Sequence, residues 1–476
     1  MTLRRADGTG GFFPMRLLGM SCYLAWESLI APFERAYHVE VFATPFVRLC
    51  LFSLLTAACM VASAWYGRTR ELRSVGRGPV MACGVCALAV PALDLVGAWV
   101  PGGAAFDLLA IVLRSVANAG FFVMWNVQLA AHRAQVAWIA YGGSFALTAC
   151  IHILVNALGG AAIAVAVVAL PVGSTGFLLM SRRLPQEPAL SEGAVSWKFP
   201  WRPAILMTVF SFAFYVVGHL DGNLLVSSEI GRLSVSMVLL VCLLRAFDRF
   251  DIGLLFKVSP ALMAAGMLLC GVPGLVDTFD VRGFLVSVGY SGFMLYLYVT
   301  LNTVCFRFGA PAAWLFGITQ AACCIVNIPS SALGDWLAAV GPRDPLAVNV
   351  VLIGVAMGLV LLSMLLMTDR APVTTWGIKA VRVSTTPDGE PVAHLETSGY
   401  LENRMYRCAL VARHFGLTHR EEEVLSLLAQ DMSSTAIEET LCIAHGTLRV
   451  HVRHIYAKLG VHAREEAREV VETWRP

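Results

Sequence analysis

The sequence predicts an all-α protein, in which a bundle of twelve membrane-spanning helices precedes a small domain of four helices. Hydrophobic residues make up 57% of the 476-residue chain and charged residues only 14%, and the mean hydropathy is +0.70, which is typical of membrane proteins. The last part of the chain differs, because its apolar residues recur at the spacing of amphipathic helices among many charges. The predicted division is a membrane domain over residues 1–367, a linker over 368–402 and a four-helix domain over 403–476.

The membrane domain is predicted from twelve apolar runs, each near the ~20 residues that cross a bilayer as a helix. Their approximate limits are Phe12–Ile30, Phe42–Trp65, Val80–Val100, Ala104–Gln128, Val136–Leu158, Ala161–Met180, Ala204–Leu220, Leu233–Phe247, Ile252–Val276, Phe284–Phe306, Ala312–Val340 and Leu346–Met367. The longest loop between them, Ser181–Pro203, divides the runs into six and six.

Positive charge is shared unequally between the loops. If the chain starts in the cytoplasm, the loops on that side hold Arg68, Arg70, Arg73, Arg77, Arg133, Arg182, Arg183, Lys198, Arg202, Arg249 and Arg307. The loops on the opposite side hold only Arg35, Arg232, Arg282 and Arg343. Because cytoplasmic loops of membrane proteins are enriched in Lys and Arg, both ends of the chain are predicted to lie in the cytoplasm.

The layout of twelve spans, with both ends on one side and a longer central loop, resembles the major facilitator superfamily of transporters. That family carries the signature G-x-x-x-D-R/K-x-G-R/K-R/K between its second and third spans. Here the corresponding stretch, Gly67 to Arg77, lacks the Asp and has a different spacing. The resemblance therefore rests on the layout and implies a transporter-like fold, while the departure from the signature argues against transport activity.

Charged residues inside the apolar runs are candidates for a functional site, because an unpaired charge within a bilayer is costly. Arg114 lies near the middle of the fourth run and is the best candidate for a cavity residue. Glu27 and Arg48 lie toward the outer ends of adjacent runs and can pair. A structural ion pair and a contact to a ligand are equally compatible with these two residues. Asp94 and Asp107 lie nearer the ends of their runs and are expected to reach the interface.

The remaining polar residues of the runs suggest packing rather than chemistry. Hydrogen bonds between helices are expected for His152, Asn156, Asn302, Gln320 and Asn327. Most of the 13 cysteines lie in apolar runs, so packing is also expected of them. No metal site and no cofactor is predicted. The sequence contains no phosphate-binding loop, no H-E-x-x-H and no G-x-S-x-G motif, which argues against an enzyme.

After a linker in which Ala380–Thr385 and Val392–Leu395 are expected as short strands, the chain reads as a helix-turn-helix module. Thr418 and Glu421 have the spacing of a capping box at the start of the first helix. Ser433 is placed to cap a short second helix, and a third helix is predicted from about Gly446 to Leu459. Gly460 ends that helix as a C′ glycine does, and a fourth helix is expected from about Ala463 to Thr473.

The third helix carries the cationic face of the module. Between Glu439 and Glu465 the sequence has no acidic residue. Apolar residues at helical spacing, Leu448, Val452, Ile455 and Leu459, are expected to pack inward. The opposite strip of Arg449, Val450, Arg453 and Ala457 can then enter a DNA major groove, although a merely solvated face of a helical bundle fits the charge pattern as well.

This segment is similar to the LuxR/FixJ-type C-terminal domain, with the pattern L-T-x-R-E-x-E-V-L, I-A-x-x-L, T-V-K-x-H and I-Y-x-K-L-G-V. The matching residues are Leu417, Thr418, Arg420, Glu421, Glu423, Val424, Leu425, Ile437, Leu441, Thr447, His451, Ile455, Tyr456, Lys458, Leu459, Gly460 and Val461. The departures are Ala436, Glu438, Ala444 and Leu448; Ala444 replaces the usual Ser cap, which costs about 1 kcal/mol of helix stability.

The resemblance implies a bacterial DNA-binding domain that pairs through its fourth helix. By it, Arg449, Val450 and Arg453 meet base edges, Thr447, Lys458 and Thr435 meet phosphates, and His451 belongs to the same interface. The expected protein is a one-component transcription regulator of the bacterial inner membrane, which senses a small molecule through its membrane domain and binds double-stranded DNA as a homodimer. Two alternatives stay open: a transporter with a regulatory DNA-binding tail, and a membrane domain that only anchors the module.

Overall fold

The structure is a computed structural model. It describes residues 13–37, 44–69, 76–100, 103–132, 134–182, 199–220, 224–245, 253–270, 280–308, 310–366, 381–385, 391–395, 408–409, 411–429, 432–441 and 443–473. The chain divides into two compact units, one formed mainly by residues up to Thr368 and the other mainly by Asp369–Pro476. Each unit is described by itself.

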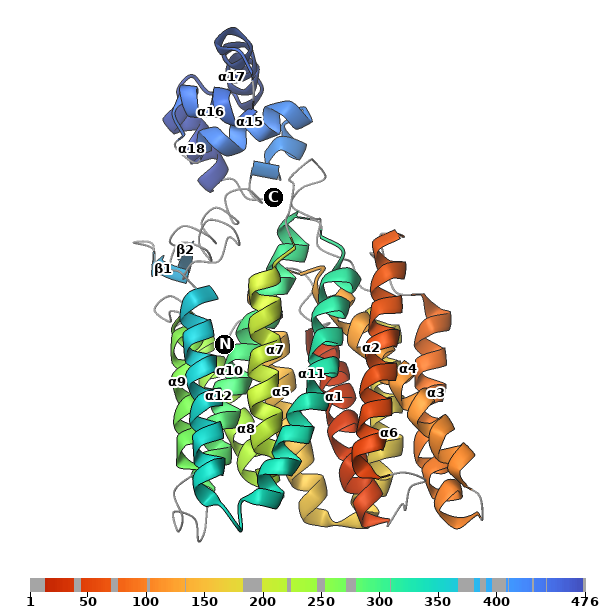
Figure 1. The fold of residues 1–476 in the computed structure, drawn as a ribbon. Helices are drawn as coiled ribbons and strands as arrows, with labels where there is room; N and C mark the ends of the chain where they lie inside the picture. The colour runs from red at the N-terminus through yellow and green to blue at the C-terminus, as the bar shows by residue number, and fades with distance from the viewer. Residues whose placement is uncertain are drawn as a thin grey trace. The chain divides into compact units, whose positions relative to one another are not determined.

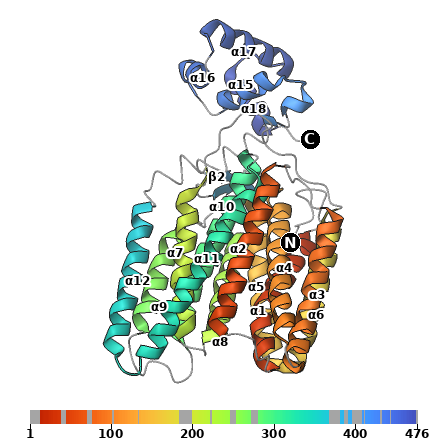
Figure 2. The ribbon, with the colours of Figure 1, turned by 45° about the vertical axis from the view of Figure 1, so that its right-hand side comes forward.

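The first unit is a bundle of long helices (Figures 1 and 2). They are α1 Phe13–Ala36, α2 Pro45–Thr69, α3 Arg77–Trp99, α4 Ala104–Leu129, α5 Ala134–Leu158, α6 Gly160–Ser181, α7 Trp201–Leu220, α8 Leu224–Arg245, α9 Gly253–Leu269, α10 Val281–Phe308, α11 Ala312–Val340 and α12 Pro345–Leu366. Each of the twelve predicted runs thus contains a helix. Successive helices run in opposite directions, so odd-numbered helices end, and even-numbered helices begin, at one end of the bundle, which we call the distal end. The other end is the proximal end.

Nine of these helices are long and apolar enough to cross a membrane by the residues that the structure describes. The other three are α1, α8 and α9. Helix α1 contains Arg16, Glu27, Glu34 and Arg35, and α8 contains Glu229, Arg232 and Arg245. Helix α9 has 17 residues, because part of its predicted run lies outside the described residues. These three helices therefore differ from the other nine in charge (α1 and α8) or in described length (α9).

The bundle consists of two six-helix halves with the same internal packing. In the first half α1 packs on α5, α2 on α4 and α3 on α6, and in the second half α7 packs on α11, α8 on α10 and α9 on α12. The halves meet where α2 packs on α11 and α5 packs on α8. In Figure 1 the first half is coloured red to yellow and the second green to cyan. Such paired repeats place binding sites of transporters near the bilayer midplane, between the halves.

Burial distinguishes the helices at the centre of the bundle from those on its outside. The apolar stretch of α10 is 78% buried, whereas that of α12 is 28% buried. Large apolar side chains such as Leu154, Val165 and Leu365 are 60–74% exposed. Exposed apolar surface on this scale would be unfavourable in water, and it fits helices that face lipid.

The second unit begins with a short hairpin. Strand β1, Val381–Thr385, pairs with strand β2, Pro391–Leu395, in antiparallel register, with Val383 opposite Ala393. The two predicted strands of the linker are therefore confirmed, and they add one small sheet to a fold that is otherwise helical in its described residues.

The C-terminal helices are α15 His419–Ala429, α16 Ser434–Leu441, α17 His445–Leu459 and α18 Arg464–Thr473. Residues 411–414, before α15, are also helical. The predicted starts and ends of the four helices agree with these bounds to within one or two residues. They enclose one apolar core that includes Val424, Leu425, Ile437, Leu448, Ile455 and Val471. The stripe that the sequence places inside is therefore buried.

Candidate nucleic-acid interface and membrane cavity

Helix α17 is delimited by the two residues that the sequence indicates. Ala444, which precedes it, is extended (φ −71°, ψ 150°) and makes no side-chain capping bond. Gly460, which follows it, adopts the left-handed conformation (φ 70°, ψ 31°) that a side chain disfavours. Its backbone N–H and that of Val461 both donate to the carbonyl of Tyr456. The start of α17 therefore depends on tertiary packing, while its end is fixed locally.

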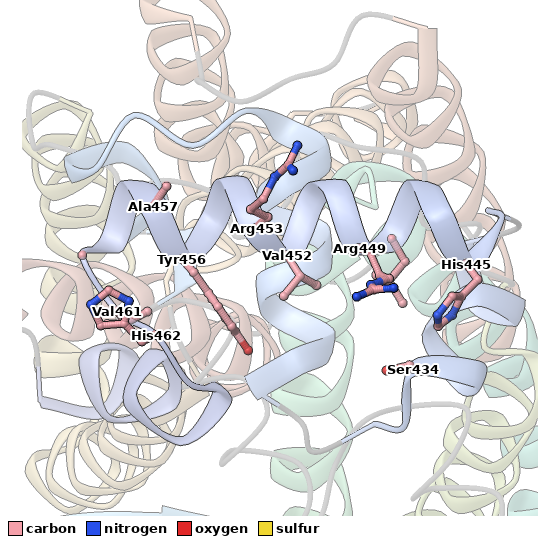
Figure 3. A pocket seen from close by; sticks show the side chains of 11 residues that line it. Ser434, His445, Arg449, Val452, Arg453, Tyr456, Ala457, Val461 and His462 are labelled. Carbon is pink, nitrogen blue, oxygen red and sulfur yellow. The ribbon is translucent and has the colours of Figure 1, made fainter.

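One face of α17 is anchored in the core and the other is free of it. Leu448, Ile455 and Leu459 are at most 7% exposed. A stripe at a spacing of four residues, His445, Arg449, Arg453 and Ala457, is exposed. Figure 3 shows these residues following one another along the helix, with Ser434 of α16 near His445. They line a hollow of about 600 Å³. Packing therefore fixes which face of α17 is presented to a partner.

The exposed face has the dimensions and charge that a DNA groove requires. An α-helix with its side chains is about 10–12 Å across and a major groove is about 12 Å wide. Arg449 and Arg453 are exposed, Val450 is 42% exposed and Thr447 is exposed beside them. His451 is half-buried, and the side chain of Thr435, in α16, lies outside the described residues. The residues predicted to read bases are thus brought together on one face.

The predicted capping box is present. The backbone N–H of Thr418 donates to Glu421 Oε2 at 2.7 Å, and the backbone N–H of Glu421 donates to Thr418 Oγ1 at 3.4 Å. Glu421 is 4% exposed. Lys458 Nζ donates to the same Oε2 at 2.6 Å and to the carbonyl of Gly416 at 3.0 Å. Lys458 therefore ties α17 to the start of α15, an internal role that the predicted phosphate contact did not include.

The electrostatics of Glu421 follow from these contacts. Burial of the carboxyl group acts to raise its pKa, but hydrogen bonds from Lys458 and Thr418 outweigh burial and hold the pKa of Glu421 at about 2, below the usual 4.5. The carboxylate is therefore ionised at neutral pH, and the Glu421–Lys458 contact is a charge-assisted hydrogen bond.

Two arginines close the ends of helices in ways that the sequence reading missed. Arg464, at the start of α18, donates to the carbonyls of Leu428 at 3.1 Å and Met432 at 2.7 Å. Arg420 donates to the carbonyl of Leu441, at the end of α16, at 2.7 Å. The carbonyls of Leu428 and Leu441 lie in the last turns of α15 and α16, where no backbone donor follows within the helix, and that of Met432 lies between the two helices. The arginines therefore hold the four helices in one arrangement, and their role depends on contacts between distant segments.

The membrane unit contains a cavity of about 1100 Å³ between its two halves. Helices α1, α2, α4 and α5 contribute one side and α7, α8, α10 and α11 the other. All three predicted cavity residues, Glu27, Arg48 and Arg114, line it. The three residues that the sequence singles out therefore share one space in the fold.

Arg114 lies at the centre of the charged wall of the cavity. Its Nη2 donates to Glu27 Oε1 at 3.0 Å, and its Nη1 lies 3.5 Å from Glu34 Oε1. The guanidinium also stacks over the ring of Phe52, 4.3 Å from its centroid. Arg114 is therefore paired on two sides, and Glu34, which the sequence reading did not single out, is part of its environment.

The predicted pairing of Glu27 with Arg48 was wrong, because each residue has another partner. Arg48 Nη2 lies 3.0 Å from Glu34 Oε1, 3.2 Å from Asp94 Oδ1 and 3.1 Å from Asp107 Oδ1. The expectation that both aspartates reach the interface was also wrong, since Asp94 is 1% and Asp107 4% exposed. The physical reason is that Arg48, on α2, reaches them on α3 and α4 and compensates their charge inside the bundle.

The proximal side of the cavity is closed by aromatic rings. Tyr298 lies within 6.2 Å, between ring centroids, of Phe122, Tyr141, Phe145 and Phe316. These rings come from α4, α5, α10 and α11, so both halves contribute. Nearer the proximal end, Asn302 Nδ2 donates to the carbonyl of His132 at 3.0 Å. The cavity therefore has a floor in which the two halves are in contact.

A second polar contact joins the halves nearer the distal end. His152 Nδ1 of α5 lies 3.2 Å from Glu229 Oε1 of α8, and Arg232 Nη1 lies 3.2 Å from Glu229 Oε2. His152 and Glu229 are both 4% exposed. The interhelical role expected of His152 is confirmed, with a carboxylate as its partner. Gln320 also accepts an interhelical bond, from Tyr298 at 3.5 Å, whereas Asn156 bonds within its own helix.

Comparison with known proteins establishes what the C-terminal unit is. Residues 416–471 match the family described as "Bacterial regulatory proteins, luxR family". Over 59 residues the chain is 44% identical to the spore germination protein GerE of Bacillus subtilis (strain 168), a segment that covers 12% of this chain and 77% of GerE. The chain belongs to the luxR family of bacterial regulatory proteins. This LuxR-family protein carries a LuxR-type DNA-binding domain, as the resemblance implied.

Solved structures identify the fold of its membrane domain. The human organic anion transporter MFSD10 (TETRAN) aligns with 75% of this LuxR-family chain and 99% of its own chain, at a TM-score of 0.52 and 12% identity. FucP, a major facilitator superfamily transporter in the outward conformation, aligns with 75% of this chain and 98% of its own, at a TM-score of 0.51 and 7% identity. At these identities the likeness shows the fold alone. The predicted major-facilitator-like fold is confirmed.

The Glu421 contact predicts how the stability of the DNA-binding domain depends on pH. The matched segment makes up most of GerE, so we expect residues 403–476 to fold alone. Since the folded-state pKa of Glu421 is lowered from 4.5 to about 2, its stabilising contribution is complete above pH 4.5 and is lost as the pH falls toward 2. Glu421→Gln should lower the free energy of unfolding of this fragment at neutral pH by about 2–3 kcal/mol. Urea denaturation followed by circular dichroism measures the difference.

The matched control is Glu465→Gln, which removes an exposed carboxylate of α18. It should change the free energy of unfolding by less than about 0.5 kcal/mol. The difference in free energy of unfolding between wild type and Glu421→Gln should shrink as the pH falls from 4.5 toward 2. If this difference in free energy of unfolding stays constant over that range, ionisation of Glu421 does not contribute to stability.

Proposed function

We propose that this LuxR-family protein is a membrane-bound one-component transcription regulator, in which a small molecule bound in the membrane cavity controls DNA binding by the C-terminal domain. The observation that carries the proposal is that one chain joins a LuxR-type DNA-binding domain to a membrane domain with a cavity of about 1100 Å³ lined by both halves. Ligand sites are typically clefts of about 300–1000 Å³ lined by apolar groups and a few placed polar ones, and this cavity has that character.

The proposal includes an orientation in the bacterial inner membrane with both ends of the chain in the cytoplasm. Arg68, Arg77, Arg182 and Arg202 lie at proximal ends of α2, α3, α6 and α7. Positive residues favour the cytoplasmic side, and α12 also ends at the proximal end. This orientation supports access of the DNA-binding domain to the chromosome.

Control by the ligand would act through the contact between the halves. A ligand in the cavity touches both halves, so it stabilises the arrangement of the two halves in which its own contacts with them are most favourable. It can shift the equilibrium only by the difference between its affinities for the two arrangements. We infer that the shift changes whether two DNA-binding domains pair through α18, so that the active species on DNA is a homodimer.

On DNA, α17 would lie in the major groove. Arg449, Val450 and Arg453 would meet base edges, since they are exposed on the face that the core does not use. Thr447, His451 and Thr435 would contact the phosphate backbone of the DNA. Lys458 would do so only while also bound to Glu421, because its ammonium already donates two hydrogen bonds within the domain.

A cavity-filling substitution tests the proposal without breaking the charged contacts. Ala31 lines the cavity and is exposed to it, whereas Ala62 is exposed on α2 and does not line it. Genome-wide mapping of DNA bound by wild type, in cells grown under varied conditions, should reveal sites whose occupancy changes by about 5–150-fold, the usual range of coupling between sites. Ala31→Trp should abolish these changes and Ala62→Trp should retain them. Identical changes in wild type and both variants would mean that the membrane domain is an inert anchor.

A second candidate function is transport with DNA binding as its readout. It is favoured by the major-facilitator-like fold and by a cavity that both halves enclose. Flux assays on the protein reconstituted in vesicles separate the two functions. A ligand that binds without crossing the membrane supports the regulator, and ligand-dependent flux supports the transporter.

A further inference from the structure

The start of α17 carries a contact for which the LuxR/FixJ-type pattern does not account. His445 is the first residue of the helix, and its Nδ1 lies 2.6 Å from Oε1 of Glu438 on α16. The pattern I-A-x-x-L has Ala at the position of Glu438, so the resemblance implies nothing about this pair. The side chain of His445 is 66% exposed and that of Glu438 is 21% exposed. The histidine is therefore accessible, while the carboxylate behind it is half-buried.

His445 belongs to the row of exposed residues along α17. Arg449 and Arg453 follow it at intervals of four residues, and all three are exposed and line the same hollow (Figure 3). Four residues advance a helix by about 6 Å, which corresponds to about one or two base pairs at about 3.4 Å each. Recognition helices contact base edges with residues near their N-termini. His445 is therefore placed to reach a base pair beyond the one that Arg449 would meet.

The bond to Glu438 determines which ring nitrogen His445 can present to DNA. A carboxylate only accepts hydrogen bonds, so Nδ1 of His445 is the donor in this pair. Among the described residues Nε2 has no hydrogen-bond partner, which leaves it for a partner outside the domain. In a neutral ring whose proton is on Nδ1, Nε2 is an acceptor. The contact with Glu438 thus fixes the tautomer as well as the direction of the ring.

An acceptor at this position discriminates between the groups that DNA offers. The exocyclic amino groups of adenine N6 and cytosine N4 are the donors that bases present in the major groove, whereas guanine and thymine present acceptors there. Phosphate oxygens also only accept, so a neutral His445 cannot donate to them from Nε2. The chemistry of the held ring therefore favours a base edge that carries an amino group over the phosphate backbone.

The other explanation of the pair is an ion pair that only stabilises the fold. Exposed pairs of this kind contribute little to stability, and a carboxylate beside the groove-facing row is repelled by DNA phosphates. Glu438 by itself would therefore weaken binding to every sequence. Its bond to His445 gives it a favourable effect, because a ring that is already held loses less conformational freedom when it meets a base.

We propose that His445 reads a base edge, with Nε2 accepting a hydrogen bond from adenine N6 or cytosine N4, and that Glu438 is the positioning residue that orients its ring. The inference rests on the DNA-binding part of the proposed function and not on control by a ligand. It extends the sequence that the domain distinguishes by a further base pair, beyond those assigned to Arg449 and Arg453.

The test measures binding of the full-length protein in lipid nanodiscs to a labelled duplex that carries a site found by genome-wide mapping. Adenines and cytosines of the site are replaced one at a time by analogues that lack only the exocyclic amino group. One such replacement, about one or two base pairs from the position that depends on Arg449, should weaken wild-type binding at least about fivefold. It should not weaken binding of His445→Ala further, because that variant has already lost the contact.

Glu438→Ala tests the positioning role, since it keeps the histidine and removes the group that holds it. This variant should lose most of the effect of the missing amino group, yet bind a random duplex at least as tightly as wild type does, because a negative charge is gone. His419→Ala is the matched control. His419 is an exposed histidine of α15 that lies 3.5 Å from Glu423, and its loss should leave the fivefold effect intact.

Three results would overturn the proposal. An equal loss on the specific and the random duplex for His445→Ala would make this histidine a phosphate contact. An amino group whose removal weakens wild type and His445→Ala alike has another partner. An effect that Glu438→Ala leaves intact would contradict the positioning role. Wild type that binds both duplexes equally would instead contradict sequence-specific DNA binding itself, so the failure of the inference and that of the proposed function are distinguishable.

Discussion

Replacing Arg48 by alanine should destabilise the membrane domain by about 3–5 kcal/mol, the usual cost of removing one partner from a buried ionic cluster. Arg48 is the cation that Asp94 and Asp107 share with Glu34, and its side chain is 12% exposed. Without it, three carboxylates from α1, α3 and α4 would face one another inside the bundle. Thermal unfolding of the purified protein in detergent, followed by tryptophan fluorescence, measures the effect.

Arg35→Ala provides the matched control, because it removes an exposed arginine from the end of α1. It should change stability by no more than about 0.5 kcal/mol. A further variant, Arg48→Met combined with Asp94→Asn and Asp107→Asn, removes charge from both sides of the cluster and should recover most of the loss. If Arg48→Ala unfolds at the wild-type temperature, the cluster does not stabilise the bundle.

The individual charges of this cluster were predictable, but their pairing was not. Arg114 and Glu27 stand out in the sequence because each interrupts an apolar run. Which carboxylate meets which guanidinium depends on how each helix is rotated about its axis, and sequence spacing gives no information about that for neighbouring helices. Glu34 was missed for a simpler reason, since α1 extends to Ala36 while the predicted run ended at Ile30.

In the DNA-binding domain, features formed by residues close together in the sequence were predictable, and contacts between distant residues were not. The capping box joins Thr418 to Glu421, and the left-handed turn concerns Gly460 alone; both can be read from a few adjacent residues. The bond between Lys458 and Glu421 spans 37 residues, and that between Arg464 and Met432 spans 32. Such contacts exist only after the helices have packed, so a lysine that reads as a phosphate ligand can instead be a structural donor.

Arg449 and Arg453 have no such internal partner among the described residues of the domain. Their exposed position on α17 makes them the residues whose loss should affect DNA binding most. Arg449→Ala should weaken binding to a specific site by about 1–3 kcal/mol and relax the preference at one base position. The double variant Arg449→Ala/Arg453→Ala should lose about 2–6 kcal/mol, if each arginine meets its own base pair. Fluorescence anisotropy of a labelled duplex, with the full-length protein in nanodiscs, measures both losses.

Specific and random duplexes must be compared, because a lost phosphate contact weakens binding to all sequences alike. Arg413→Ala serves as the control, since Arg413 is an exposed arginine of the same domain outside α17. It should leave the ratio of specific to random affinity unchanged. An equal loss on both duplexes for Arg449→Ala would assign this arginine to the phosphate backbone. Because Leu448, Ile455 and Leu459 fix the rotation of α17 in the core, that result would also require another face of the domain to read the bases.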